Sequence, residues 1–248
     1  MGCKRIGWLL IFLLYVGIAF AQNLDDQERR WAISGSWGGD WPIVTKNTLS
    51  GKAVSTGHIH TLLLEYYIPY TRFSLKGGYT GEEIKLNPGI SASLSNLEVG
   101  GRYYFLPQRF VIQPYGGLST AWNLSPRRQY DITSGSYYDP SRQEFRKYYD
   151  CRYQVKEPLF TISPVIGADI YFLSCLAFTL EYNFRMGIAG RMNGEVEKTN
   201  SRGTGIVRSS GMRQTLSVGV KVNFPFTITQ TDGNSILQLL DEVIFGEE

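Results

Sequence analysis

The chain has 248 residues, with 25 basic against 22 acidic side chains and a formal net charge of +3. Because the charges balance and no basic stripe stands out, a nucleic-acid partner is not expected. The 27 glycines, 16 tyrosines and 13 phenylalanines are typical of β-structure, and past the N-terminus no apolar run reaches the ~18 residues that indicate a membrane-spanning helix.

The first 21 residues have the pattern of a secretory signal peptide. Lys4 and Arg5 precede an uncharged apolar run that ends in the small-residue pattern Ala19-Phe20-Ala21. The run is shorter than the ~20 residues that a spanning helix needs. We therefore expect export, with cleavage after Ala21.

Eight later segments alternate large apolar residues with polar or small ones. This period of two is the mark of a strand whose two faces meet different surroundings. Most of the segments reach the roughly 9 to 11 residues of a tilted membrane strand. We expect strands at Trp31–Gly38, His58–Ile68, Arg72–Thr80, Leu94–Leu106, Phe110–Trp122, Leu159–Phe172, Leu176–Gly187 and Arg213–Phe224.

The connections between these segments alternate between long and short. The short ones are Pro69–Thr71, Pro107–Arg109 and Leu173–Cys175. Outer-membrane barrels have short periplasmic turns and longer extracellular loops, whereas a Greek-key sandwich has no reason to alternate in this way. We predict an all-β fold, an eight-stranded antiparallel up-and-down transmembrane β-barrel.

Three stretches carry a family resemblance. They are Gly-Gly-Arg-Tyr-Tyr-Phe at Gly100–Phe105, Pro-Tyr-Gly-Gly at Pro114–Gly117, and the last strand. Together they resemble the outer-membrane β-barrel domain family of the OmpA transmembrane-domain-like or opacity type, within the porin-family proteins. The resemblance implies the fold, an outer-membrane location, and membrane lipids and the barrel assembly machinery as partners, but no activity. It would place the assembly signal on Ser217, Gly219, Val222 and Phe224.

The chain continues past this final aromatic residue, where many such barrels end. Apolar residues at helical spacing predict a short amphipathic helix over Ser235–Phe245. The expected organisation is a signal peptide at 1–21, a periplasmic segment at 22–30, the barrel at 31–226 and a periplasmic tail at 227–248.

Aromatic residues gather beside the short turns. Rings with a polar tip suit the headgroup level of a membrane. We expect an aromatic girdle formed by Tyr66, Tyr67, Tyr103, Tyr104, Phe105, Tyr171 and Phe172.

The polar faces of the strands carry charges of both signs. An eight-stranded barrel is just wide enough for side chains to fill it, and charges inside must be paired. Two interpretations stay open, a salt-bridge core that plugs the lumen and a narrow path for ions or small solutes. The expected network is Glu65, Arg72, Lys76, Glu98, Arg102, Asp169, Glu181, Arg185 and Lys221.

The third long loop is unusually rich in tyrosine and arginine, the residues most enriched at binding hot spots. It could present a binding surface, and it could equally be two strands that continue above the membrane as a hairpin with aromatic residues paired across it. The two interpretations are compatible. The candidate surface residues are Arg127, Arg128, Tyr130, Tyr137, Tyr138, Arg142, Tyr148 and Tyr149.

His58 and His60 are the candidates for a membrane-embedded lipid-modifying enzyme or protease. They share parity with Leu62 and Leu64, which face outward, and no acid converges on them. No nucleophile elbow or zinc-type spacing is present. We therefore expect no catalytic residue, metal or cofactor, and we expect Cys151 and Cys175, at opposite ends of the barrel, to be free thiols.

The leading hypothesis is a non-enzymatic, monomeric barrel in envelope structure or surface recognition, whose third loop binds a surface glycan or protein. A narrow channel and a barrel enzyme are the alternatives.

Overall fold

The computed structural model describes residues 29–49, 53–107, 110–140, 142–198 and 204–224. The predicted signal peptide, most of the predicted periplasmic segment at 22–30 and the predicted tail helix lie outside these residues. Within the described ranges, no helix is long and apolar enough to cross a membrane.

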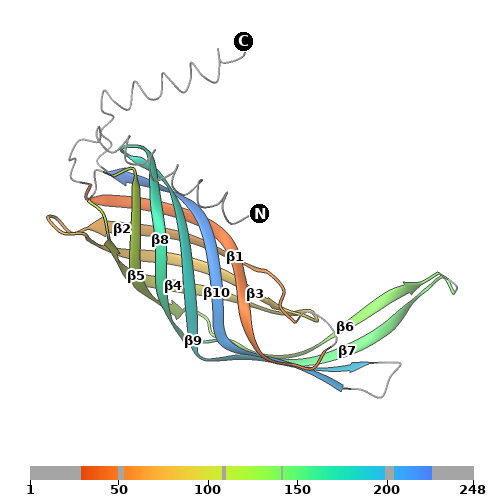
Figure 1. Cartoon of the computed structure of the whole chain (residues 1–248). Helices are drawn as coiled ribbons and strands as arrows, with labels where there is room; N and C mark the ends of the chain where they lie inside the picture. Colours follow the sequence, from red (N-terminus) through yellow and green to blue (C-terminus); the bar gives the residue numbers. More distant parts are fainter. Residues whose placement is uncertain (1–28, 50–52, 108–109, 141, 199–203, 225–248) are drawn as a thin grey trace, which may run out of the picture.

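Ten antiparallel strands are described, and eight of them close into a barrel (Figure 1). Closure comes from β10, which pairs with both β1 and β9, while β5 pairs directly with β8. Strands β6 and β7 therefore leave the barrel as a hairpin. The strands are β1 (Trp31–Asn47), β2 (Gly57–Tyr67), β3 (Phe73–Leu86), β4 (Ile90–Tyr104), β5 (Ile112–Asn123), β6 (Arg128–Asp139), β7 (Glu144–Lys156), β8 (Phe160–Leu173), β9 (Leu176–Lys198) and β10 (Thr204–Phe224).

The eight predicted barrel strands are confirmed, but several are longer than predicted. Strands β9 and β10 have 23 and 21 residues and continue past the barrel, where the end of β9 pairs with β7. They bend as they leave the barrel (Figure 1), near Ala189 with its positive φ and a register shift between Ser210 and Met212. We call β6, β7 and the ends of β9 (191–198) and β10 (204–210) the extension.

The two faces of each barrel strand differ as the alternation predicts. In β9, Glu181 and Arg185 are buried inside the barrel, while Leu180 and Tyr182 are exposed on its outside. An apolar exterior around a polar interior is the arrangement of a barrel that faces lipid. The exposed apolar residues of this outer band include Ile33, Leu62, Leu64, Leu75, Leu97, Val99, Leu118, Ile166, Ile170, Phe178, Val218 and Val220.

The prediction of an aromatic girdle is only partly right. Tyr66, Tyr103, Phe105 and Phe172 lie on the outer face, but three of the predicted girdle residues are buried inside. The inward residues have the parity of the lumen charges, because Tyr67 follows Glu65 by two positions, as Tyr104 follows Arg102 and Tyr171 follows Asp169. The buried tyrosines at this end are Tyr67, Tyr104 and Tyr171, joined by Tyr115.

Beyond the barrel rim, the interior of the molecule becomes apolar. On β3 the inward residues change from Glu82 to Ile84, and on β4 from Asn96 to Leu94. These residues pack against the inner face of the extension, and none is more than 6% exposed. The resulting loop-end core is Ala53, Ile84, Leu86, Ile90, Ala92, Leu94, Cys151, Val155, Met192, Val196 and Val207.

Candidate functional site

The lumen holds one connected network of buried charges. Arg102 lies between two carboxylates, with its Nη1 2.7 Å from Glu65 Oε2 and its Nη2 bonded to Glu181. Lys76 Nζ lies 3.3 Å from both Glu98 Oε1 and Glu181 Oε1. Because every one of these groups is removed from water, the pairing is what offsets their desolvation.

Toward the loop end the network continues from the predicted Arg185 to three residues that were not predicted, Asp40, Glu82 and Arg213. Arg185 pairs with Glu98 and lies 3.4 Å from Glu82. Arg213 pairs with Glu82 and lies 3.3 Å from Asp40 Oδ2. Asp40 and Glu82 follow the predicted ends of their strands, so only longer strands would have revealed them. Arg213 has the inward parity of Thr215 and Ser217, which is a signal that the sequence did contain.

At the turn end, tyrosines close the network. Lys221 Nζ pairs with Asp169 and lies 2.7 Å from Glu65 Oε2. The Tyr104 hydroxyl lies 2.8 Å from Glu65 and 3.0 Å from Asp169, and it accepts a hydrogen bond from Lys221. Arg29 covers the ring of Tyr171, with its guanidinium carbon 3.8 Å from the ring centroid. Charge and aromatic rings therefore fill this end of the lumen.

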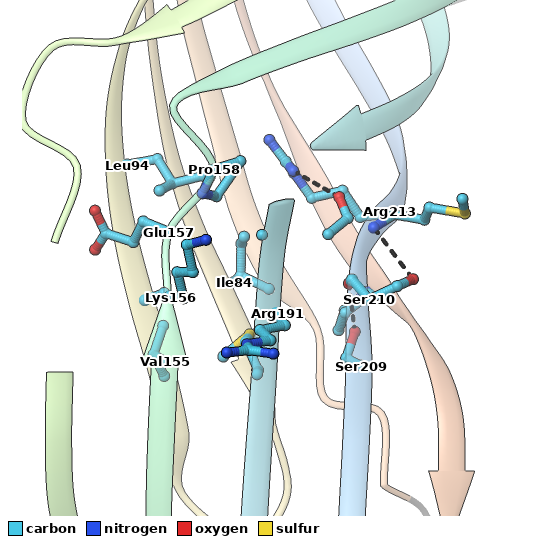
Figure 2. A pocket seen from close by; sticks show the side chains of 16 residues that line it. Ile84, Leu94, Val155, Lys156, Glu157, Pro158, Arg191, Ser209, Ser210 and Arg213 are labelled. Carbon is cyan, nitrogen blue, oxygen red and sulfur yellow. Dashed lines mark hydrogen bonds between the residues drawn. The ribbon is translucent and has the colours of Figure 1, made fainter. Parts of the chain in front are cut away.

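At the loop end, the network stops at a small cavity below the loop-end core. The cavity has a volume of about 20 Å³ and is lined by Ile84, Leu94, Val155 and Arg213, among others (Figure 2). A cavity of this size holds about one water molecule. The lumen is thus covered by apolar side chains where the extension crosses its mouth.

Eight of the nine predicted lumen charges are buried inside the barrel, and Arg72 is the exception. It precedes the first residue of β3, is exposed, and donates a hydrogen bond to the carbonyl oxygen of Phe105. Arg72 was predicted to face the lumen because it alternates with Ser74 and Lys76. It lies just before the first residue of the strand, where the chain is already turning.

The third loop is a regular hairpin, which is the second of the two interpretations of its sequence. Strands β6 and β7 pair from Arg128–Lys156 to Asp139–Glu144, with a bulge after Gly135. Aromatic rings pair across the tip, Tyr137 with Tyr148 at 6.3 Å and Tyr138 with Phe145 at 5.3 Å between centroids. These rings are exposed to solvent.

The predicted surface residues of this loop do not form one patch. Tyr130 lies at the base of the hairpin and accepts a hydrogen bond from Gln154. Tyr149 packs partly against the loop-end core. Arg127 precedes β6, and its backbone N–H donates to the buried carboxylate of Glu157. Tyr130 is exposed at the base, and the tip carries the cluster of exposed aromatic residues Tyr137, Tyr138, Phe145 and Tyr148, with Arg142 in the turn.

The two histidines lie on the outer surface, as their parity predicted. The expectation that no acid lies beside them was wrong, because His58 Nε2 is 3.1 Å from Oε2 of Glu83, which follows the predicted end of its strand at Thr80. The ring of His60 packs against Tyr79. In the part of the chain that the structure describes, no group of three or more metal-ligating side chains comes together. Cys151 is buried in the extension and Cys175 lies at a short turn, and both are free thiols.

The predicted assembly signal lies on the last barrel strand, β10. Val222 and Phe224 have the outward parity, whereas Ser217 faces the lumen. At Gly219, an added Cβ would lie 2.4 Å from the carbonyl oxygen of Gly35 on β1, so the seam between β1 and β10 leaves no room for a side chain there.

No protein-family model and no curated relative matches the chain. Several solved structures are similar to it. Neisserial surface protein A shares 14% identity over 78% of this chain and 97% of its own, with a TM-score of 0.46. The outer membrane protein OprG from Pseudomonas aeruginosa shares 12% identity over 79% of this chain and 96% of its own, with a TM-score of 0.40. The N-terminal β-barrel domain of Pseudomonas aeruginosa OprF shares 10% identity over 80% of this chain and 100% of its own, with a TM-score of 0.39. The strand pairing and the two faces described above themselves define an eight-stranded barrel of the outer-membrane type.

Proposed function

We propose that the chain is a monomeric, non-enzymatic outer-membrane barrel that recognises a surface glycan or protein through the tip of the β6–β7 hairpin. The observation that carries this proposal is the set of aromatic side chains exposed on the tip. Phe145 is 76% exposed and Tyr138 52% exposed, on a part of β6 and β7 that is not buried on either face. Exposed aromatic clusters on a rigid arm are typical of contact surfaces.

The lumen supports a structural role for its charges. An open path would need a continuous hollow lined by charged groups that water can reach. Instead, the carboxylates and cations are paired with one another, tyrosines fill one end and the loop-end core covers the other. A narrow channel would require both ends to move.

The surroundings of the histidines support a non-enzymatic reading. His58 and His60 face outward, and the acid beside His58 is the partly exposed Glu83. A barrel hydrolase or acyltransferase built on them would lose its activity when both become alanine. An activity that survives in the His58→Ala, His60→Ala variant would remove these residues from consideration.

The binding proposal is tested by shortening the hairpin without disturbing the core beneath it. Removal of all of Ser125–Glu157 would also delete Cys151 and Val155, which belong to the loop-end core. Instead, residues 136–148 are replaced by Asn-Gly, which suits a two-residue hairpin turn between the paired residues Gly135 and Tyr149. The shortened protein should still show a heat-modifiable gel shift, which reports a folded barrel.

Refolded full-length and shortened proteins are then applied to arrays of neutral, carboxylated and sulfated oligosaccharides and of purified extracellular proteins. We expect signals that the shortened protein loses and that Tyr138→Ser weakens at least tenfold, as for a hot-spot tyrosine. The matched control is Tyr70→Ser, since Tyr70 is fully solvent-exposed at a short turn on the opposite end. Equal signals from the full-length and shortened proteins would refute the proposal.

A further inference from the structure

Three basic side chains lie directly opposite one another at the base of the extension. In the register, Arg128 of β6 faces Lys156 of β7, and Lys156 faces Arg191 of β9. Directly opposite side chains on one face are about 5 Å apart at Cβ, and like charges in such positions are destabilising. We call Arg128, Lys156 and Arg191 the basic row. Figure 2 shows Lys156 and Arg191 on their two neighbouring strands.

The basic row has the parity opposite to that of the loop-end core, and Lys156 and Arg191 also border the small cavity beside that core. On β7 the neighbour Val155 is buried in that core, and on β9 the neighbour Met192 is buried there, so Lys156 and Arg191 have the opposite parity. Within the ranges described by the structure, none of the three basic groups forms an ion pair. Glu157 next to the row is buried and accepts hydrogen bonds from Asn123 and from the backbone of Arg127.

The next row on the same face adds positive charge and hydrogen-bonding groups. It runs from Tyr130 through Gln154 and Asn193 to Arg208, and Arg208 faces Lys46 of β1. The nearest acid on this face, Glu195, is one row farther along and lies directly opposite Arg152. The two rows nearest the barrel therefore carry five positive charges and no carboxylate.

The position of the basic row indicates what meets it. Arg191 follows the exposed Ile188 by three residues, Lys156 precedes the exposed Leu159 by three, and Arg128 follows the exposed Leu124 by four. At no more than about 3.6 Å per residue, the row lies within roughly 14 Å of the last apolar outward residues. This is the distance at which long basic side chains reach the headgroup layer beside a hydrocarbon core.

From the like-charge register, the missing counter-charges and this position, we propose that the basic row binds the phosphate groups of a phosphorylated glycolipid in the outer leaflet. Arginine and lysine supply charge-assisted hydrogen bonds to phosphate oxygens, and a phosphate between facing strands removes the repulsion within the row. The base of the hairpin is thereby held at the membrane surface. This inference does not depend on the binding role of the hairpin tip.

The test compares two triple variants of the full chain in phosphatidylcholine nanodiscs that contain lipid A. In the row variant, Arg128, Lys156 and Arg191 become glutamine. The matched control changes Arg142, Arg146 and Lys147 at the hairpin tip to glutamine, which removes the same charge. Native mass spectrometry counts the lipid A molecules that each protein retains.

We expect the row variant to retain lipid A roughly a hundredfold more weakly, since each basic residue near an anionic surface contributes about a factor of five. The control should retain it as the unchanged protein does. The stability of each protein against unfolding is also measured in phosphatidylcholine nanodiscs without lipid A, to show that the variants are folded. There the row variant should be at least as stable as the unchanged protein, because the repulsion between its basic side chains is gone.

Three results would overturn the inference. The first is an equal loss of lipid A from the tip control, and the second is equal retention of lipid A whose phosphates have been removed. The third is full displacement by inorganic phosphate or by a soluble acidic polysaccharide, which would assign the row to a free anion. Loss of partner binding in the tip control with lipid A retained would leave the basic-row inference intact.

Discussion

The barrel and the region beyond its rim share several strands but have opposite interiors. Along β4, the inward side chains are Arg102, Glu98 and Asn96 in the barrel, and then Leu94, Ala92 and Ile90 in the extension's core. The outward side chains change in the reverse sense, from Val99 and Leu97 to serines. Because the side-chain parity is unbroken, the change reflects the surroundings, lipid outside the barrel and water outside the extension.

The largest expected effect comes from breaking the charged interior of the barrel. Arg102→Met leaves Glu65 and Glu181 buried without their shared cation, and removal of one partner of a buried pair costs about 3–5 kcal/mol. The measurement is urea unfolding in lipid vesicles, followed by the heat-modifiable gel shift. Arg72→Met is the matched control, since Arg72 is exposed and should change stability by less than about 0.5 kcal/mol. Similar midpoints for the two variants would contradict a paired lumen.

The apolar interior of the extension is tested by a cavity in the loop-end core. Leu86 is 1% exposed there, so Leu86→Ala should cost about 2–5 kcal/mol. Its effect should appear as faster amide exchange in the end of β9 and in β7, with the barrel strands unchanged. Ile132→Ala, on the exposed face of the hairpin, should leave exchange unaltered. Faster exchange throughout the barrel would instead show that the two regions unfold as one unit.

This inversion also explains how far the sequence could be interpreted. Inside the barrel, strict alternation predicted eight strands and eight of the nine lumen charges, because lipid and lumen demand opposite side chains. At the rim the apolar side chains move from the outward to the inward positions of a strand, as the inward residues of β3 change from Glu82 to Ile84. A pattern with apolar residues on one face only therefore ends at the rim. The predicted strands therefore stopped short of Asp40 and Glu82. The hairpin was predicted only as one of two interpretations of the third loop.

Tyrosine limited the prediction in a different way. Its ring suits a headgroup and its hydroxyl suits a buried hydrogen bond, so residue type alone could not separate a girdle from a lumen plug. Parity could have done so, since Tyr104 lies two residues from Arg102. The basic row could not have been found, because the pairing of β6, β7 and β9 depends on the long extension of β9.

The smallest expected effect concerns the thiol in the loop-end core. Burial raises the pKa of Cys151 from its ordinary value near 9 to about 11. At pH 8 the thiolate fraction falls about a hundredfold, so iodoacetamide should modify the folded Cys175→Ser variant at least a hundredfold more slowly than the urea-unfolded chain.

The sign of the pH dependence follows from the raised pKa of Cys151. The folded state holds the proton more tightly, so the stabilising contribution is complete below about pH 9 and is lost as the pH rises toward 11. For the labelling rates, the comparison is the Cys151→Ser variant, whose remaining cysteine is Cys175. Cys175 lies at a short turn and is partly exposed. Equal labelling rates for the two single-cysteine proteins in the folded state would mean that the extension does not cover Cys151.

The most direct test of a filled, covered lumen is single-channel recording of the folded mature protein in a planar bilayer. With the charges paired and both ends occupied by side chains, we expect a silent bilayer at moderate voltage, and Glu181→Gln should alter stability but open no steady conductance. Steady, charge-selective steps in the unchanged protein would contradict this account and make the narrow channel the better description.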